Sequence, residues 1–460
     1  MAMHRTVVLD VVGLTPELLG DATPNLSRLS REGARRDLRT ITPAVTCSVQ
    51  STFLTGTLPR EHGIVANGWL FRDLAEVWLW RQSNALVAGE KVWEAARRRD
   101  PAFTVAKLFW WYNMYSSADC AVTPRPLYPA DGRKIPDVYT EPEDLRTELN
   151  ARLGPFPLFN FWGPNADITS TQWIARSAQH VFDARKPTLT LVYLPHLDYE
   201  LQRVGPARTE RIDRALREVD QVVGELCEHV RRAGARILVL SEYGITAVRD
   251  AVHINRALRR AGLLRVRHEL GLEKLDAGAS DAFAVADHQL AHVYVRRPDR
   301  VPEVKQLLEG LDGVDQVLDE ESKRAFGLDH ARSGELVAIS RPDRWFSYYY
   351  WLDDEVAPDF ARTVDIHRKP GYDPVELFLD PGLRFPKVRV GMRLLQKVLG
   401  FRYLMDVIPL DATLVRGSHG RITDRPEQGP LVISTEPKLL PEGPVEATAV
   451  KALILRHVFD

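Results

Sequence analysis

The chain has 460 residues, of which 45% are hydrophobic and 27% are charged. Its 61 basic and 62 acidic residues leave a formal net charge of −1. This composition excludes an intrinsically disordered chain, which would be poor in apolar residues and carry a high net charge. It also argues against bulk nucleic-acid binding, which usually requires a strongly basic protein. We therefore expect a globular chain that buries a sizeable core.

The cysteines and the hydropathy exclude further classes of protein. Cys47, Cys120 and Cys227 form no CxxC pair, which disfavours both a disulfide scaffold and a thiolate zinc site. The first apolar run is too short for a signal peptide and ends at Asp10. No stretch approaches the ~18 uninterrupted apolar residues of a membrane-spanning helix. We predict a cytoplasmic protein with no membrane partner, and the oligomeric state stays open.

Short apolar runs alternate with amphipathic segments along the chain. Residues 6–9 form a compact β-branched run, and Thr23-Pro24 then begins a helix that ends at Gly33. Residues 189–194 and 236–241 are further buried runs, and between them the apolar positions of 212–230 recur every three or four residues. This pattern predicts an α/β fold with a mostly parallel central sheet and helices on both faces.

Two stretches resemble additions to this core. Residues 70–165 are rich in aromatic residues, proline and glycine. Residues 250–335 have their own pattern, with strands expected at 282–285 and 290–295 and a helix at 302–311. We predict that residues 1–249 and 336–460 form the catalytic α/β core, which includes the insertion 70–165, and that residues 250–335 form a small inserted α+β cap.

Acidic residues follow three of the expected strands. Asp10, Asp198 and Glu242 come at or just past the ends of these strands. Ligands of open parallel sheets bind beyond the carboxyl ends of the strands. A single acid there can equally cap a helix or solvate a loop. A shared site and separate caps are both open interpretations, and three acids in succession favour the shared site.

Thr46 is a candidate nucleophile. It lies where a loop enters a short helix that we expect to end at Gly56. A helix N-terminus has unpaired N–H groups and a positive dipole end, which favour a phosphate and a deprotonated oxygen. Thr46 can also be the N-cap of this helix, and that role is compatible with catalysis.

At this point the chain resembles a known family. Thr46, followed by Thr55-Gly56 and His62-Gly63, resembles the nucleophile segment of the alkaline phosphatase superfamily, and most closely that of the nucleotide pyrophosphatase/phosphodiesterase branch. Residues 195–206 resemble its Asp-x-x-x-His motif followed by Gly-Pro, 241–244 its Ser-Asp-His-Gly motif, and 417–420 its late Gly-x-His-Gly motif. These motifs occur in the family order and span residues 10–420.

The resemblance implies a metal-dependent hydrolase of phosphate esters that acts through a phospho-enzyme on Thr46. Two divalent metal ions, usually zinc, would clamp the phosphoryl group of a small-molecule substrate. Carried over position by position, the ligands of one ion are Asp10, Thr46, Glu242 and Tyr243. The ligands of the other ion are Asp198, Gln202 and His419. A phosphodiesterase or nucleotide pyrophosphatase activity is the implied function.

The sequence departs from the family pattern at four positions. Gln202 and Tyr243 replace ligand histidines, Glu242 replaces an aspartate, and Val49 stands where the branch often has a phosphate-binding asparagine. These changes remove imidazoles and add oxygens, which suits manganese or magnesium better than zinc. Three interpretations remain: a two-metal enzyme with an altered site, an enzyme with one well-formed metal site, and a protein that binds a phosphate compound without hydrolysing it. Because Asp10, Thr46, Asp198 and His419 are all retained, we favour catalysis.

The substrate is the least defined part of this interpretation. Candidate substrate-binding residues are His196, Trp111, Lys134, His367 and Arg368. Trp111 would stack on a base or sugar, and the basic side chains would pair with phosphate or a charged leaving group. Ordinary structural roles are equally open for these residues. A phosphomonoester or a phosphonate is an alternative to the diester.

Overall fold

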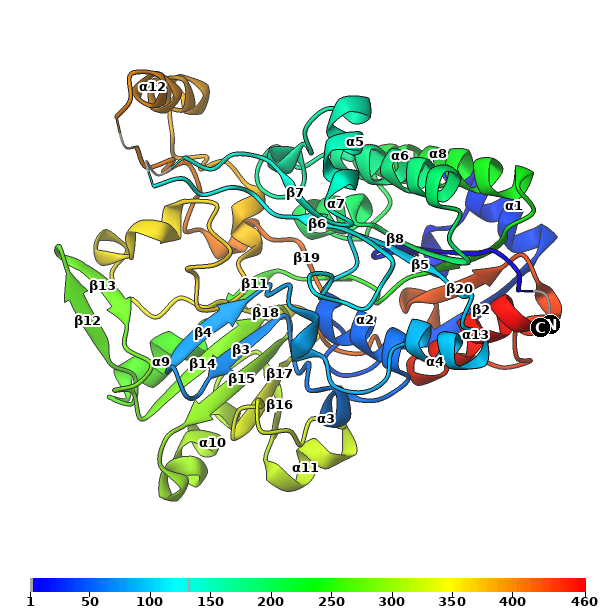
Figure 1. Ribbon diagram of the computed structural model, residues 1–460. Helices are drawn as coiled ribbons and strands as arrows, with labels where there is room; N and C mark the ends of the chain where they lie inside the picture. The colour runs from blue at the N-terminus through cyan, green and yellow to red at the C-terminus, as the bar shows by residue number, and fades with distance from the viewer. Residues whose placement is uncertain (1–2, 131–132, 402) are drawn as a thin grey trace.

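A central sheet of nine strands organises the molecule (Figure 1), and its order is β21-β2-β20-β9-β1-β8-β5-β6-β7. The computed structural model describes residues 3–130, 133–401 and 403–460. Strands β9, β1, β8, β5 and β6 run parallel, which confirms the predicted mostly parallel sheet. The strands are β1 Thr6–Val11, β2 Ala34–Arg39, β5 Val105–Leu108, β6 Cys120–Pro124, β7 Val138–Glu141, β8 Leu189–Leu194, β9 Arg236–Leu240, β20 Leu431–Ser434 and β21 Val445–Glu446.

Strand β1 lies at the centre of this sheet. Every residue of β1 is buried, as expected for a parallel strand covered on both faces. Its register places Asp10 beside Tyr193 of β8 and Leu240 of β9. The carboxyl ends of three neighbouring parallel strands therefore meet at one edge, where the acids follow.

Helices cover both faces of the sheet, as predicted (Figure 1). The long helix α8 buries Ile212, Leu216, Val219 and Val223, which is the apolar stripe expected from the sequence. One layer contains α1 Pro24–Glu32, α5 Asp144–Leu153, α6 Ile168–Arg185, α7 His196–Val204 and α8 Glu210–Arg232. The other contains α2 Thr46–Thr55, α4 Val92–Arg99 and α13 Val450–Phe459, with the short α3 Pro59–His62 after α2.

A second, antiparallel sheet has the order β14-β15-β17-β16. Strand β17 follows the predicted end of the cap at residue 335, yet it pairs with β15 and β16. The boundary at residue 335 stays a prediction. The elements of this region are α9 Ile254–Arg260, β14 Ala282–Asp287, β15 Leu290–Val295, α10 Val301–Glu309, β16 Val314–Leu318, α11 Glu320–Ala325 and β17 Leu336–Ser340.

Four small two-stranded sheets complete the strands. They pair β3 Gly68–Phe71 with β4 Glu76–Leu79, β10 Thr246–Ala247 with β19 Gly417–Ser418, β11 Asp250–Val252 with β18 Arg344–Phe346, and β12 Val266–Glu269 with β13 Leu272–Leu275. The β10–β19 pair matters most for the site, because it brings the segment that carries His419 back to the end of β9.

The two ends of the chain lie side by side (Figure 1). The amide of His4 donates a hydrogen bond to the carbonyl of Val458 over 2.8 Å. A bridge between Ala44 and Gly420 joins the segment before α2 to the segment after β19. These pairings bring Asp10 and His419 into one unit although they are far apart in sequence. No helix among the described residues is both long and apolar enough to cross a membrane.

Candidate active site

The three acids at the strand ends converge on one buried cluster. Asp10 lies near the end of β1, Glu242 follows β9, and Asp198 lies in the first turn of α7 after β8. Asp10 and Glu242 are fully buried, and Asp198 is 6% exposed. Glu242 raises the pKa of both Asp10 and Asp198 through charge repulsion, in addition to the larger effect of burial. The structure thus brings the acids together as a shared site requires.

Thr46 is the first residue of helix α2. The N-cap position belongs to Val45, so Thr46 is not the capping residue considered as its alternative role. Its Oγ1 lies 3.1 Å from the hydroxyl of Tyr243. The helix ends at Thr55, and Gly56 follows with φ of 73°, which confirms the predicted end. The Thr46 side chain therefore points from the start of α2 towards the acids.

Gln50 joins two of the acids from one turn further along α2. Its Nε2 donates to Glu242 Oε1 over 2.7 Å and to Asp10 Oδ2 over 3.2 Å. Its Oε1 accepts from the backbone N–H of Trp111 over 2.8 Å, which fixes the orientation of the amide. The other carboxylate oxygens, Asp10 Oδ1 and Glu242 Oε2, are buried without a hydrogen-bond partner. Orphaned buried carboxylate oxygens carry a desolvation cost that a cation would relieve.

A second half of the cluster is built on α7. Gln202 Nε2 donates to Asp198 Oδ2 over 2.6 Å, and Gln202 Oε1 accepts from the hydroxyl of Tyr372 over 3.0 Å. The hydroxyl of Tyr243 lies 3.4 Å from Asp198 Oδ1 and connects this half to Thr46. Burial raises the pKa of Asp198 to about 7. The two halves therefore meet at Thr46 and Tyr243, which lie close enough to Glu242 to lower its pKa, although burial raises that pKa more.

Four aromatic rings stack over this network. The ring of His419 lies between those of Tyr243 and His288, with both pairs of centroids 3.6 Å apart, and His288 in turn lies 3.7 Å from Tyr372. His419 Nδ1 donates to the carbonyl of Ala44 over 2.8 Å. Burial lowers the pKa of His419 to about 3, so its ring is neutral near pH 7. Its Nε2, 3.8 Å from Asp198 Oδ1, therefore keeps a lone pair directed at the acids.

The donor set fits divalent cations, although each half is sparse. Asp10 Oδ1, Glu242 Oε2 and the hydroxyl of Thr46 are oxygen donors in the first half. Asp198 and the Nε2 of His419 are donors in the second. Among the residues that the structure describes, no Lys or Arg forms an ion pair with these acids, and no three His, Cys, Asp or Glu side chains gather as a metal site. Each half of the cluster has two His, Asp or Glu side chains among the predicted ligands, namely Asp10 and Glu242 in the first and Asp198 and His419 in the second. The other predicted ligand positions are occupied by Thr46, Tyr243 and Gln202.

Tyr243 is the weakest of the predicted metal ligands. Burial, together with the charges of Asp198 and Glu242, raises the pKa of its phenol well above the ordinary value. At neutral pH it is therefore a hydrogen-bond donor and not a phenolate. Its position between Thr46 and Asp198 suits it to orient the threonine hydroxyl.

Among the predicted substrate-binding residues, Trp111, Lys134 and His367 form one group, and Arg368 stands apart from them. Trp111 is buried and lies 4.7 Å from Trp80 between ring centroids. His367 lies close enough to Lys134 for the charge of the lysine to contribute to the lowering of its pKa, of which burial is the larger cause. Arg368 pairs instead with Asp365, over 3.3 Å, on an exposed loop.

His196 lies outside the site. Its Nε2 is 3.1 Å from Glu218 on α8, so the side chain turns towards the helix layer. His196 lies two positions before Asp198, and this spacing on a helix directs the two side chains to different faces. We leave His196 out of the proposed substrate site.

Sequence reasoning missed three members of the cluster. Gln50 follows Thr46 by four residues, a spacing that places both side chains on one face of α2. His288 stands in the tight turn between β14 and β15 with φ of 59°, which non-glycine residues rarely adopt. Tyr372 follows the candidate residues His367 and Arg368 by a few positions. The helical spacing could have revealed Gln50, but no local signal places a cap histidine over the sheet.

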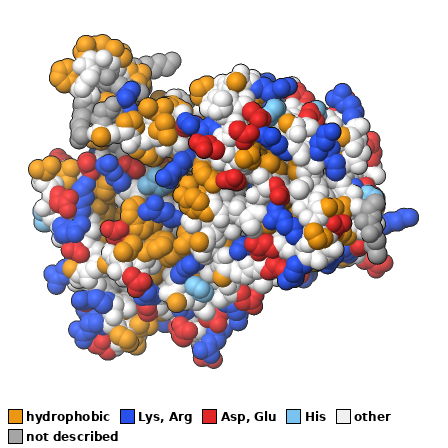
Figure 2. Space-filling model, viewed as in Figure 1, with side chains coloured by type: hydrophobic (Ala, Val, Ile, Leu, Met, Phe, Trp, Pro, Cys, Tyr) orange, Lys and Arg blue, Asp and Glu red, His pale blue; other side chains and the backbone are white. Residues whose placement is uncertain are grey.

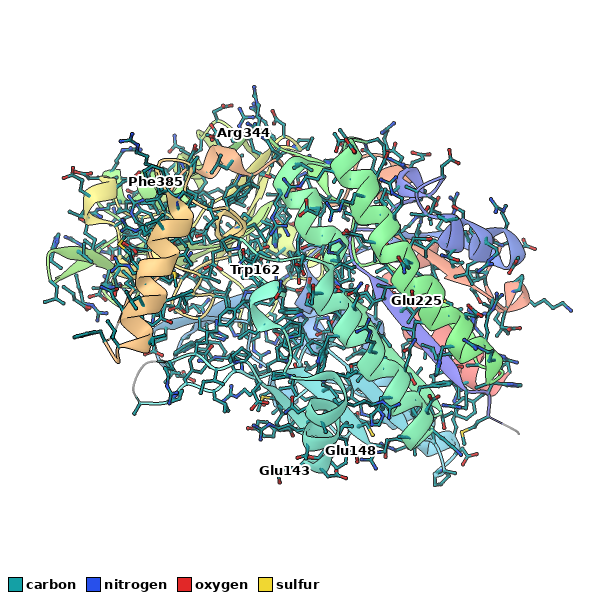
Figure 3. The ribbon with its side chains drawn as sticks, turned by 90° about the horizontal axis from the view of Figure 1, so that it is seen from above. Glu143, Glu148, Trp162, Glu225, Arg344 and Phe385 are labelled. Carbon is teal, nitrogen blue, oxygen red and sulfur yellow. The ribbon has the colours of Figure 1, made fainter. Side chains whose placement is uncertain are left out.

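The partly exposed Trp80 and Trp162 mark the outer boundary of the cluster. Both rings approach Tyr372, with centroids 6.0 and 5.6 Å away, respectively. Figure 3, which views the helix layer from above, shows Trp162 between that layer and the half of the molecule that carries helix α12, Pro386–Val398. Thr46 itself is 3% exposed. A substrate that reaches Thr46 must therefore displace some of these aromatic side chains.

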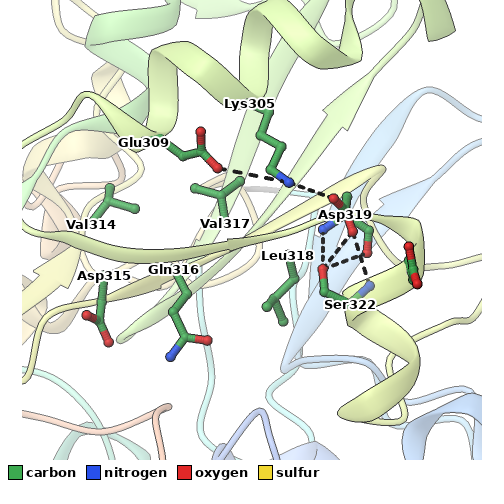
Figure 4. A pocket seen from close by; sticks show the side chains of 10 residues that line it. Lys305, Glu309, Val314, Asp315, Gln316, Val317, Leu318, Asp319 and Ser322 are labelled. Carbon is green, nitrogen blue, oxygen red and sulfur yellow. Dashed lines mark hydrogen bonds and ion pairs between the residues drawn. The ribbon is translucent and has the colours of Figure 1, made fainter.

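A separate groove lies on the outer side of the second sheet (Figure 4). It has a volume of about 660 Å³ and is lined by residues of α10, β16 and α11. Lys305 crosses it to pair with Asp319 over 2.6 Å. None of its lining residues belongs to the Thr46 cluster, and we assign it no role in the chemistry.

Comparisons with known proteins agree with this arrangement. No curated protein sequence matches the chain. Among solved structures, the chain is similar to phosphonoacetate hydrolase from Sinorhizobium meliloti in complex with phosphonoformate, with a TM-score of 0.62, 15% identity, and coverage of 99% of this chain and 96% of that one. It is also similar to murine ectonucleotide pyrophosphatase/phosphodiesterase 5, as an inactive variant in complex with AMP, with a TM-score of 0.58, 13% identity, and coverage of 99% and 94%.

These likenesses show the fold. The family assignment rests on a model named "Type I phosphodiesterase / nucleotide pyrophosphatase", which matches residues 6–373. The matched range includes Asp10, Thr46, Asp198 and Glu242 and most of the chain. The chain therefore belongs to the type I phosphodiesterase/nucleotide pyrophosphatase family, a group of divalent-metal-dependent phosphoric ester hydrolases.

Proposed function

We propose that the protein hydrolyses a phosphodiester or nucleotide pyrophosphate bond in a small molecule, with Thr46 as the nucleophile. The observation that carries this proposal is the position of the Thr46 hydroxyl at the start of α2. Hydrogen bonds through Tyr243 link it to Asp198, and it lies next to Glu242, which Gln50 joins to Asp10. A helix N-terminus favours the phosphate, and the acids are the groups that would hold cations next to it.

The two halves of the network suit different cations. The first half presents carboxylate and hydroxyl oxygens from Asp10, Glu242 and Thr46, and we assign it manganese or magnesium. The second half adds the imidazole of His419 to Asp198, which also suits zinc. When bound, such cations polarise the phosphoryl group and lower the pKa of the threonine hydroxyl.

The protein groups then perform a two-step displacement. Thr46 Oγ1 forms a bond to phosphorus while the bond to the leaving alcohol or phosphate breaks. Water cleaves the resulting threonine ester and restores the hydroxyl. Tyr243, 3.1 Å from Thr46 Oγ1, orients the hydroxyl before attack and donates to a phosphoryl oxygen afterwards.

We assign the organic part of the substrate to the aromatic boundary. Trp80 and Trp111 present ring surfaces on one side of Tyr372, and Trp162 lies on another. Such rings can stack on a base or an aryl group. Lys134 and His367 lie next to each other and supply donors for a charged substituent. The arrangement favours a diester with one aromatic or heteroaromatic substituent.

The cellular location stays a prediction. All three cysteines are buried and unpaired, as in a protein of a reducing compartment, which supports the cytoplasm.

The direct test measures turnover of bis-p-nitrophenyl phosphate by the purified protein with added manganese, magnesium or zinc. We expect release of p-nitrophenol that stops on chelation and in Thr46→Ala. The panel also contains p-nitrophenyl phosphate as a monoester and phosphonoacetate as a phosphonate, because one structurally similar protein is a phosphonoacetate hydrolase. Diester turnover that survives in Thr46→Ala would remove the nucleophile assignment. Faster turnover of the monoester or phosphonate would replace the proposed substrate class.

A further inference from the structure

Helix α12, Pro386–Val398, projects from the body of the protein (Figure 1). Of the 18 large hydrophobic side chains that the described residues expose, nine lie between positions 385 and 404. Isolated exposed apolar residues are ordinary, but a concentration of this kind marks an interaction surface. Figure 2 shows these side chains gathered on the outer face of the helix.

The apolar residues of α12 follow helical spacing on the side that faces solvent. Phe385, Val388, Met392, Leu395 and Leu399 recur at intervals of three or four, and each is more than half exposed. Val398, beside them, is 81% exposed. In Figure 3 Phe385 stands at one end of the helix. The exposed stripe therefore runs the full length of α12.

Two arginines of the helix face the protein instead. Arg389 and Arg393 both pair with Asp406 on the segment that returns from the helix. Val390 and Met405 pack against the hydrophobic core of the second sheet and anchor the helix from the same side. A surface helix of a globular protein normally has the reverse orientation, with its apolar stripe towards the core. The observed orientation holds the apolar stripe outward by ion pairs.

The charge of the segment around α12 indicates which kind of partner the exposed apolar stripe contacts. Between residues 380 and 406 the chain has six basic residues and two acidic ones, Asp380 and Asp406, which leaves a net charge of +4; the basic residues are Arg384, Lys387, Arg389, Arg393, Lys397 and Arg402. Two copies of so basic a helix would repel each other, which disfavours self-association through this face. Apolar side chains flanked by arginine and lysine match the boundary between lipid headgroups and acyl chains.

We propose that α12 lies in the surface of an anionic lipid bilayer and attaches the protein to it peripherally. The apolar stripe from Phe385 to Leu399 enters the acyl boundary, and Arg384 at the start of the stripe pairs with headgroup phosphates. This inference does not depend on the proposed catalytic function. It differs from the sequence-based expectation of no membrane partner, which considered only segments that span a bilayer.

A label on the helix tests the proposal directly. The native cysteines are all buried, so Val398→Cys can be labelled selectively with a polarity-sensitive fluorophore. We expect a blue shift and brighter emission on addition of vesicles of equal parts phosphatidylcholine and phosphatidylglycerol. The matched control is Leu270→Cys, at an equally solvent-exposed apolar position on the β12–β13 hairpin, and its label should not respond. An absent response at Val398→Cys, or the same response at both positions, would overturn the proposal.

A pair of variants separates the apolar and electrostatic contributions. Leu395→Glu combined with Leu399→Glu should abolish co-flotation with the anionic vesicles, whereas Leu270→Glu should float like the wild type. Arg384→Gln should weaken binding about fivefold, and raised salt should weaken it further. Equal binding to pure phosphatidylcholine vesicles would contradict the lipid charge requirement. Sedimentation that reveals a dimer lost in the double variant, without flotation of the wild type, would replace the lipid with a second copy of the chain.

Discussion

Around Thr46 the protein buries acids that have no Lys or Arg partner among the described residues, whereas along α12 it exposes apolar side chains to water. The two regions depart from the usual distribution of polar and apolar groups in opposite directions. The acids are held by hydrogen bonds from Gln50 and Gln202, and α12 is held by the ion pairs of Arg389 and Arg393. In each region the protein's own contacts fix a geometry that a further component must complete, a cation in one and a lipid surface in the other.

We expect the largest effect when the nucleophile of the first region, the cluster around Thr46, is removed. Thr46→Ala should lower kcat for bis-p-nitrophenyl phosphate by roughly 10³-fold or more, since the covalent step is lost. Thr46→Ser retains a hydroxyl and should retain a measurable fraction of the activity. Thermal melts of both variants check that the buried site still folds. Comparable activities in Thr46→Ala and Thr46→Ser would show that the hydroxyl takes no part.

Binding of a cation to the acids should raise the free energy of unfolding of the protein. Added manganese should stabilise the wild type against unfolding by about 2.7 kcal/mol at a concentration one hundred times its Kd. Asp10→Asn removes one buried carboxylate charge beside Glu242, so the chelated variant should be at least as stable as the chelated wild type. Manganese should no longer stabilise this variant. Denaturant unfolding with and without the metal measures both effects, and equal stabilisation of both proteins would place the cation elsewhere.

His288 tests whether the cap contributes to the site. Its ring stacks against His419 and Tyr372, and its Nδ1 is buried without a partner. His288→Ala should lower kcat about 10- to 100-fold, the effect typical of groups that position metal ligands. His253→Ala is the matched control, because His253 is a largely buried histidine that stacks on Tyr349 away from Thr46. Equal losses in the two variants would indicate general damage to the cap.

The smallest expected effect tests whether α12 and the cluster around Thr46 act independently of each other. The exposed position of Leu395 predicts that Leu395→Glu changes the free energy of unfolding by less than about 0.5 kcal/mol. It should also leave the turnover of a water-soluble diester unchanged, because the helix lies outside the Thr46 network. Steady-state kinetics without vesicles checks this independence. A marked loss of kcat would show that α12 and the catalytic cluster are coupled.

Local patterns predicted the central sheet well. The buried apolar runs predicted β1 and β8, and the three- and four-residue spacing predicted α8, because both features depend on which face of an element is buried. The cap boundary was harder to predict. Strand β17 comes after a long helical and loop segment, and its pairing with β15 depends on tertiary contacts that no local pattern encodes.

The candidate site was predictable where residues end parallel strands. Asp10 lies near the end of β1 and Glu242 follows β9, and the adjacency of these strands brings the two acids together. His288 approaches from a different sheet, and its position over His419 follows from how the second sheet packs beside the first. The outward orientation of the apolar stripe of α12 could not be predicted either. The sequence shows an amphipathic helix, but it does not show that ion pairs to Asp406 turn the arginine side of the helix towards the protein.

Elemental analysis of the purified protein tests the central claim most directly. The claim is that the buried acids around Thr46 exist to hold divalent cations for phosphoryl transfer. We predict that the wild type retains a divalent cation through gel filtration and that Asp10→Asn retains less of it. A wild-type protein that is free of metal, and that turns over diesters equally well in the presence of a chelator, would contradict the account.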